Sequence, residues 1–267
     1  MSPSVGAWRV ALLSLAIAVL SSCGGGGGGG TPPVQTKPTA QGCQSSSNSA
    51  SNVIGVCVDA GPLASQTEVN RLYTDITICE TGTSNCQTID HILVDTGSVG
   101  LRLLESEVTV GAGSTGFFNC VRFLDLSYAW GAVKSLDLRL GQQIISALPV
   151  QFFGSASQDC ATGGYSPIET VADLGAKGIL GIGLFEQDCG PDCSVGTTGQ
   201  YYRCQGVCRP ATVDVTAQLQ NPIARLGSDL NNGFVVKLPA ASAPGVSELR
   251  GELIFGIETL SNNRLGA

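Results

Sequence analysis

The residues with the clearest potential for chemistry lie in one short segment. Residues 91–104 read HILVDTGSVGLRLL, in which an apolar run leads into Asp95, Thr96, Gly97 and Ser98. An aspartate that follows a buried strand has a position fixed by the backbone of that strand. Two such carboxylates that lie close together can act as general acid and general base in hydrolysis. The alternative is an ordinary turn aspartate, which is common after a strand.

The rest of the chain predicts the strands that must hold this segment. From residue 53 onward, apolar and β-branched runs alternate with turn-forming Gly, Asn and Ser. Short helices are expected only near Glu169–Leu174 and at Thr212–Leu226, the second interrupted by Pro222. The predicted strands are Val53–Val58, Leu72–Ile78, Ile89–Val94, Leu101–Leu104, Ser135–Leu140, Ile144–Phe153, Phe234–Leu238 and Gly251–Ile257. We therefore expect an all-β domain with one or two short helices.

The composition argues against several classes of protein. The 267 residues include 14 Lys and Arg against 21 Asp and Glu, and this excess of negative charge argues against a nucleic-acid-binding protein. His91 is the only histidine, so a histidine-based metal site is excluded by count. No Gly-x-Ser-x-Gly motif is present for a serine hydrolase. We expect neither a cofactor nor a metal, and we expect His91 to be packed or hydrogen-bonded near Asp95.

The N-terminal part of the chain predicts export and anchoring. Residues 1–22 combine Arg9 with an apolar run that is too short to span a membrane but suits a signal peptide. The run ends in the letters LSSC, which resemble a bacterial lipobox, and Cys23 is the expected lipidation site. Residues 23–52 are rich in Gly, Pro and Ser and predict a flexible tether. The expected location is the cell envelope, with 53–267 as a folded domain held at a membrane by its lipid.

Eleven cysteines predict an oxidising compartment. If Cys23 carries a lipid, ten remain, which is an even number. Cys79 and Cys86 flank a turn between two predicted strands and are therefore placed to staple a hairpin. Two Cys-x-x-x-Cys pairs begin at Cys189 and Cys204. Disulfides are the favoured interpretation of these pairs in an exported protein, and a four-thiolate zinc site is the alternative.

Four features in order along the chain resemble the pepsin-like aspartic proteases. The first is the segment at Asp95, and the second is Gly178–Gly183 (GILGIG), which resembles the element beside the catalytic loop of that family. The third is a hairpin segment in which Tyr128 and Trp130 are the expected flap residues that contact substrate, although the family has Gly-Thr-Gly after its Tyr. The fourth is Gly251–Ile257, which resembles the strand after the first lobe. The lipobox, the tether and the cysteine-rich insert also resemble a bacterial lipoprotein family of unknown function with an Asp-Thr-Gly core.

The resemblance implies a fold, a substrate class and a role for each residue of the segment. The fold would be the N-terminal half-barrel lobe of the pepsin-like proteases, and the ligand would be a peptide or protein. Asp95 would be one of two carboxylates that share a proton. The Thr96 hydroxyl would hydrogen-bond inward, Gly97 would let a backbone N–H approach the carboxylate, and the Ser98 hydroxyl would bond its outer oxygen.

A second catalytic aspartate is not evident. The 267 residues hold no other Asp-Thr-Gly or Asp-Ser-Gly, and Asp59 lies too near Asp95 in sequence for two lobes to fit between them. Asp59 is instead expected on or beside the N-terminal strand. The expectation is therefore a chain that lacks the C-terminal lobe and is inactive alone.

Three explanations follow for the missing aspartate: a truncated two-lobed protein, a homodimer in which each chain supplies one Asp, or a non-catalytic descendant that uses the cleft for binding. The expected function is an envelope-anchored lipoprotein with an aspartic-peptidase-like domain. The alternative is a non-enzymatic, disulfide-stapled binding or scaffold lipoprotein.

Overall fold

The predicted apolar and β-branched runs form strands of a single sheet, some of them buried at every position. The computed structural model describes residues 42–43, 50–157, 160–243 and 245–266, all within a unit that spans 37–267. Cys23, the predicted signal peptide and most of the predicted tether lie outside the described residues. No helix in the described part of the chain is long and apolar enough to cross a membrane.

Thirteen strands in the described ranges make up the sheet. They are β1 (Val53–Val58), β2 (Tyr73–Cys79), β3 (Cys86–Asp95), β4 (Val99–Leu104), β5 (Gly113–Arg122), β6 (Ser127–Leu140), β7 (Gln143–Phe153), β8 (Ser166–Pro167), β9 (Gly178–Ile182), β10 (Tyr201–Gln205), β11 (Val207–Pro210), β12 (Phe234–Lys237) and β13 (Leu249–Phe255). The short helices are α1 (Val171–Leu174) and α2 (Asp192–Val195), with 3-10 turns at Glu105–Glu107, Val215–Ala217 and Ile223–Arg225.

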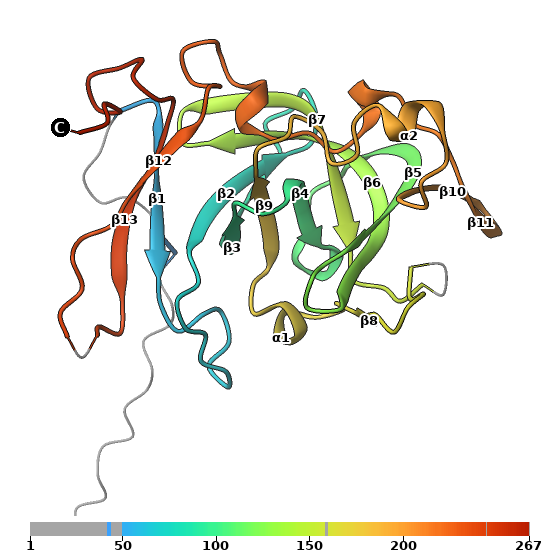
Figure 1. Cartoon of the computed structure of the whole chain (residues 1–267), viewed down its shortest axis with the longest axis horizontal. Coiled ribbons are helices and arrows are strands. Elements are labelled where there is room, and N and C mark those ends of the chain that lie inside the picture. The colour runs from blue at the N-terminus through green and yellow to red at the C-terminus, as the bar shows by residue number, and fades with distance from the viewer. Residues whose placement is uncertain (1–41, 44–49, 158–159, 244, 267) are drawn as a thin grey trace, which may run out of the picture. The chain divides into compact units, whose positions relative to one another are not determined.

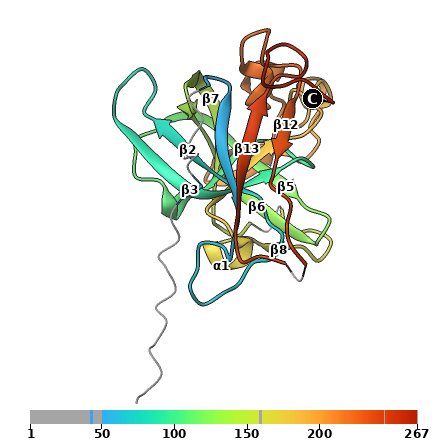
Figure 2. The same cartoon turned by 90° about the vertical axis from the view of Figure 1, so that its left-hand side faces the viewer.

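The strand order closes part of the sheet into a ring. Twelve strands follow one another in the order β11-β10-β5-β6-β7-β4-β9-β3-β2-β1-β13-β12, and β8 pairs with β6. An additional antiparallel pairing of β2 with β6 closes the ring β6-β7-β4-β9-β3-β2. The largest apolar cluster contains Ile76, Leu101, Leu138, Val150 and Leu180, one from each of five of these strands. β1 and β13 lie side by side outside the ring (Figure 2).

The all-β prediction is confirmed, and the helix prediction is half right. All eight predicted strands are present, and β1 has the predicted bounds. The helix near Glu169–Leu174 is α1, which begins with a reciprocal capping box between Thr170 and Asp173. The predicted helix at Thr212–Leu226 is wrong, because only two 3-10 turns form there. Pro222 has no N–H to donate within a helix, and the buried side chain of Gln218 bonds backbone groups outside the segment.

Ten cysteines in the described residues form five disulfides, which supports the disulfide interpretation over a zinc site. Cys79–Cys86 staples the β2–β3 hairpin as predicted. Both Cys-x-x-x-Cys pairs close on themselves, as Cys189–Cys193 and Cys204–Cys208. No group of three or more His, Cys, Asp or Glu side chains in the described ranges is arranged to hold a metal ion. The two remaining bridges are Cys43–Cys57 and Cys120–Cys160.

Candidate functional site

Asp95 lies at the end of β3, where three strands meet. β9 lies between β3 and β4, parallel to the first and antiparallel to the second (Figure 1). Asp95 is opposite Gly181 of β9, and the Gly183 N–H donates to the Ser98 carbonyl at 2.8 Å. A Cβ atom on Gly181 would come within 2.8 Å of the Val99 backbone, so only glycine permits this close approach. The element at 178–183 therefore lies beside the Asp95 loop.

The Asp95 carboxylate is held by its own loop. The Gly97 N–H donates to Asp95 Oδ1 at 2.8 Å, which is the approach expected of this glycine. Asp95 is half-buried and forms no ion pair with any described residue. Its second oxygen, Oδ2, accepts no hydrogen bond within the described part of the chain. The carboxylate thus keeps one oxygen available for a ligand.

The two hydroxyl groups of the loop do not make the expected bonds. Thr96 is exposed, and its hydroxyl makes no hydrogen bond to the described residues. The inward hydrogen bond expected of this hydroxyl is therefore not formed. The Ser98 Oγ is buried without a hydrogen-bond partner among them, so it does not bond Asp95. The hydrogen bond that the loop gives to the carboxylate comes instead from the Gly97 N–H.

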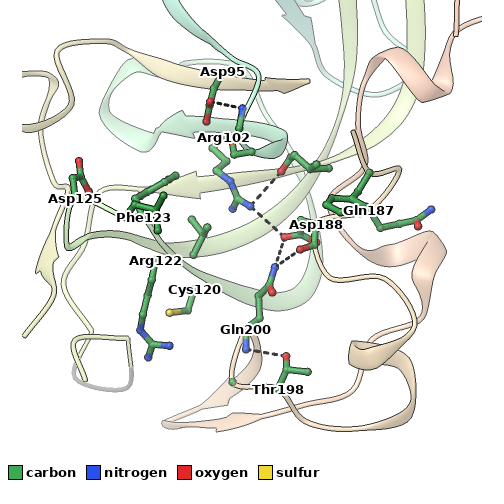
Figure 3. Close-up of a pocket in the computed structure, with 17 residues that line it drawn as sticks. Asp95, Arg102, Cys120, Arg122, Phe123, Asp125, Gln187, Asp188, Thr198 and Gln200 are labelled. Carbon is green, nitrogen blue, oxygen red and sulfur yellow. Dashed lines mark hydrogen bonds and ion pairs between the residues drawn. The ribbon is translucent and has the colours of Figure 1, made fainter. Parts of the chain in front are cut away.

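Asp95 opens onto a cavity of about 710 Å³. Figure 3 shows Asp95 above the Arg102 side chain, with Phe123 on one side and Asp188 on the other. The tip of the β5–β6 hairpin contributes apolar Phe123 and the fully exposed Leu124. The complete lining is Asp95, Gly97, Ser98, Val99, Arg102, Cys120, Val121, Arg122, Phe123, Leu124, Asp125, Phe185, Gln187, Asp188, Thr198, Gly199 and Gln200. The cavity therefore has apolar residues at the hairpin tip and a polar floor.

The floor rests on a buried ion pair that the sequence did not single out. Arg102 Nη2 of β4 lies 3.2 Å from Asp188 Oδ2, and the two side chains are only 1% and 3% exposed. The same Asp188 carboxylate accepts from Asn119 at 3.0 Å, from Gln200 at 2.8 Å and from the Tyr201 hydroxyl at 2.7 Å. Such a pair is tolerated in the interior because both side chains make further hydrogen bonds, although Arg102 Nε has no partner among the described residues. The available signal was an arginine in the otherwise apolar run GLRLL.

This network connects the elements that surround the cavity. Asn119 belongs to β5, the first strand of the hairpin, and Gln200 immediately precedes β10. Arg102 also donates to Gln151 of β7, whose amide in turn donates to the Asn119 carbonyl at 2.7 Å. Because buried polar networks of this kind rigidify a structure, we expect the β5–β6 hairpin, the cavity floor and residues 189–208, which carry the two Cys-x-x-x-Cys pairs, to keep fixed relative positions.

Tyr128 and Trp130 are not placed at the cavity. Both side chains are buried, at 1% and 5% exposure, in a cluster with the Cys120–Cys160 disulfide and Tyr202. They lie two residues apart on β6 and therefore share one face of the strand. The Tyr128 hydroxyl accepts from the Ser157 N–H at 3.0 Å, and neither residue lines the cavity. The hairpin residues that line the cavity are instead Phe123 and Leu124.

Asp59 and His91 form a separate charged cluster. His91 is buried, and its Nδ1 and Nε2 lie 3.0 Å from Asp90 Oδ1 and 3.2 Å from Asp59 Oδ2. Burial opposes the charged imidazole, but the hydrogen bonds and charges of Asp59 and Asp90 outweigh it and raise the pKa of His91 to about 9. Asp59 follows β1, as expected, and does not line the cavity.

The fold and the cavity define an all-β protein in which the half-buried Asp95 carboxylate, bound by no cation among the described residues, lines a cleft. The chain belongs to DUF3443, a family of proteins of unknown function, whose model matches residues 48–267. The aspartic proteinase from Irpex lacteus is a similar solved structure, with a TM-score of 0.47 and 16% identity. The match covers 80% of this chain and 50% of that one, so this chain spans about half the proteinase's length. No curated protein matches the chain.

Proposed function

We propose that the chain is a peptide-binding module that carries one carboxylate of a two-carboxylate hydrolytic site. The observation that carries this proposal is Asp95 itself, an unpaired carboxylate at the mouth of a 710 Å³ cavity and next to a hairpin tip. A carboxylate that keeps a free oxygen in a cleft can accept from a peptide N–H or activate a water. The apolar hairpin residues Phe123 and Leu124 provide contact area for peptide side chains.

Hydrolysis of a peptide requires more than this chain supplies at the cavity. One carboxylate acts as base toward water while a second protonates the carbonyl oxygen, and the pair shares one proton. Asp188 cannot serve as the second, because its oxygens already accept from Arg102 and three other donors. Asp125 also lines the cavity, but it is exposed at the hairpin tip, where its Oδ1 accepts from the N–H and the hydroxyl of Ser127. The chain alone therefore binds peptides without cleaving them, and turnover needs an aspartate from another lobe or a second copy.

The proposal is tested by measuring binding and cleavage on the same protein. We expect a fluorescein-labelled statine peptide to bind the full chain by fluorescence anisotropy, and a fluorogenic peptide to remain uncleaved at pH 4. Asp95→Asn should weaken binding about tenfold, because a hydrogen bond to a charged group contributes about 1.5 kcal/mol or more. Asp214→Asn is the matched control, since Asp214 is exposed and does not line the cavity.

Two results would contradict the proposal. Equal binding by the wild type and Asp95→Asn would remove Asp95 from the site. Cleavage by the dilute chain that disappears in Asp95→Asn would show that it is an active peptidase alone. Cleavage that rises with the square of protein concentration would instead identify a homodimer as the source of the second carboxylate.

The second candidate function is a non-enzymatic binding or scaffold protein. It is favoured by five disulfides, which suit a durable extracellular module, and by Leu184 and Phe185, which are 99% and 74% exposed beside the cavity. In this case Phe185→Ser would abolish partner binding, whereas Asp95→Asn would leave it unchanged.

A lipid anchor at Cys23 would place this module in the cell envelope, as the LSSC sequence after an apolar run suggests. Several acyl chains on one cysteine would hold the chain stably at a membrane. Metabolic labelling with an alkyne fatty acid should mark the wild type and not Cys23→Ser. Equal labelling of the two would rule out this anchor.

A further inference from the structure

The strand that carries Asp95 contains an irregularity four residues earlier. Thr74 and Ile76 of β2 pair with Ile92 and Ile89 of β3, so Asp90 and His91 together oppose a single residue of β2. His91 has a φ of 52°, a backbone conformation that is uncommon outside glycine, although Asn, Asp and His adopt it more often than other residues do. This is a β-bulge, a feature that bends a strand and changes the direction of the residues beyond it.

The bulge lies at the point where β3, already paired with β2, also begins to pair with β9. Parallel pairing with β9 begins at the next residue, Ile92, and continues to Asp95. The Lys177 N–H, immediately before β9, donates to the His91 carbonyl at 3.0 Å. The direction in which the last four residues of β3 run along β9 therefore depends on the backbone at His91.

The side chain of His91 fixes this strained backbone from both sides of the ring. Asp90 Oδ1 lies 3.0 Å from Nδ1 and Asp59 Oδ2 lies 3.2 Å from Nε2, while Lys177 Nζ contacts the same Asp90 oxygen at 2.6 Å. The Tyr73 ring packs on the imidazole with its centroid 5.3 Å away. A backbone conformation that costs energy persists only when such surroundings determine it.

We propose that His91 is a positioning residue for Asp95, because it locks the bulge that directs the end of β3 toward the cavity. The inference rests on the proposed role of Asp95, but its structural part can be tested independently. The charged groups coupled to His91 are Asp59 after β1, Asp75 of β2 and Asp90 of β3. Two cations act on these carboxylates in turn: Lys177 before β9 on Asp90, and Arg250 of β13 on Asp59 and Asp75. Each ring nitrogen of His91 lies against a carboxylate oxygen, which can only accept a hydrogen bond. Both nitrogens must therefore carry a proton for the bulge to be held in this way, and the imidazole is then cationic.

The chain offers a matched control for a substitution at His91. Ala147 of β7 also has a positive φ, 50°, in a bulge where two residues of β7 oppose Asp137 of β6. Ala147→Val therefore strains a bulge in a different pair of strands, none of whose residues lines the cavity. His91→Leu strains the bulge of β3 and also removes both hydrogen bonds of the ring, whereas His91→Asn suits a positive φ and retains one donor.

The test compares stability with the geometry at Asp95. We expect His91→Leu to shift the Gly97 amide proton resonance, which reports the 2.8 Å bond to Asp95, and to weaken statine-peptide binding about tenfold. His91→Asn should recover part of both losses. Ala147→Val should lower the free energy of unfolding but leave the Gly97 resonance and the binding unchanged.

Other outcomes have defined meanings. If His91→Leu keeps the wild-type Gly97 resonance and its binding within twofold, the inference is overturned and His91 is merely structural. If the wild type itself binds no statine peptide, the proposed function fails and the Gly97 resonance alone decides the inference. If His91→Leu does not fold, Asp59→Asn replaces it, because this change keeps the size of the side chain while it removes one charge and one of the two oxygens that bond Gly61 N–H and His91.

Discussion

Single residues decide how charge is distributed around Asp95. Two positively charged side chains are buried on β3 and β4, and each is neutralised by carboxylates: His91 by Asp59 and Asp90, and Arg102 by Asp188. Asp95, between them in sequence, has no such partner among the described residues. The cleft therefore presents an uncompensated carboxylate, which is the condition for binding a donor or sharing a proton.

The first prediction concerns the dependence of stability on pH. The pKa of His91 is raised from 6.5 to about 9 in the folded chain, so its contribution is complete below pH 6.5 and is lost as the pH rises through 9. We expect the free energy of unfolding to fall by about 3 kcal/mol between pH 6 and pH 10. Urea denaturation at intervals of one pH unit measures this loss.

His91→Gln should remove most of this alkaline loss of stability, and a variant curve that parallels the wild type would contradict the assignment to His91.

At acid pH, the hydrogen bond from His91, reinforced by Lys177 and opposed by burial, lowers the pKa of Asp90 to about 2. Stability from Asp90 is therefore present above pH 4 and is lost as the pH falls through 2.

Pairs of strands decide where the Asp95 loop lies. β4 and β9 are paired so that Gly100 and Gly181 lie opposite each other, and the two strands approach closely there. A Cβ on Gly178 or Gly181 would come within 2.6 to 2.8 Å of backbone atoms of β4. The approach of these two strands brings the Ser98 carbonyl to the Gly183 N–H and thereby fixes the loop that begins at Asp95.

The second prediction tests this close approach. Gly181→Ala should lower the free energy of unfolding by about 2 kcal/mol and weaken statine-peptide binding, because β4 must move away from β9 to admit a methyl group. Gly227→Ala is the control, since no atom outside its chain neighbours lies within 4 Å of a Cβ placed there. Thermal and urea unfolding of both variants would show the difference, and equal stability would refute the packing argument.

Across the whole domain, the disulfides contribute according to the loops they close. Cys120–Cys160 links β5 to the segment before β8 across 40 residues, whereas Cys204–Cys208 spans only 4 residues within the β10–β11 hairpin. A cross-link stabilises mainly by restricting the unfolded chain, and the effect grows with loop length. The long bridge is also packed in the cluster that contains Tyr128 and Trp130.

The third prediction follows from these loop lengths. Replacing both Cys120 and Cys160 by alanine should cost about 4 kcal/mol, and replacing both Cys204 and Cys208 should cost about 2 kcal/mol. Urea unfolding of the two double variants under non-reducing conditions compares them directly. A larger loss for the short hairpin bridge would show that chain entropy does not dominate the contribution of these disulfides.

Local patterns in the sequence determined the elements of this protein. Apolar and β-branched runs bounded by turn residues identified eight strands, and the Cys79–Cys86 pair on either side of a turn identified a hairpin disulfide. These features depend on neighbours close in sequence, so the sequence expresses them directly. The predicted helix at Thr212–Leu226 failed because contacts of Gln218 with a distant segment outweighed local propensity.

Only the tertiary structure decided which residues meet at the cavity. Arg102 and Asp188 are 86 residues apart and pair through the order of strands, which no local pattern encodes. Tyr128 and Trp130 do not line the cavity. The register of β5 with β6 determines which face of β6 packs on the Cys120–Cys160 disulfide, and both side chains lie on that face. The sequence alone determined that Asp95 follows a buried strand, whereas its accessible cavity and the locked bulge behind it arise from long-range pairing that only the folded chain establishes.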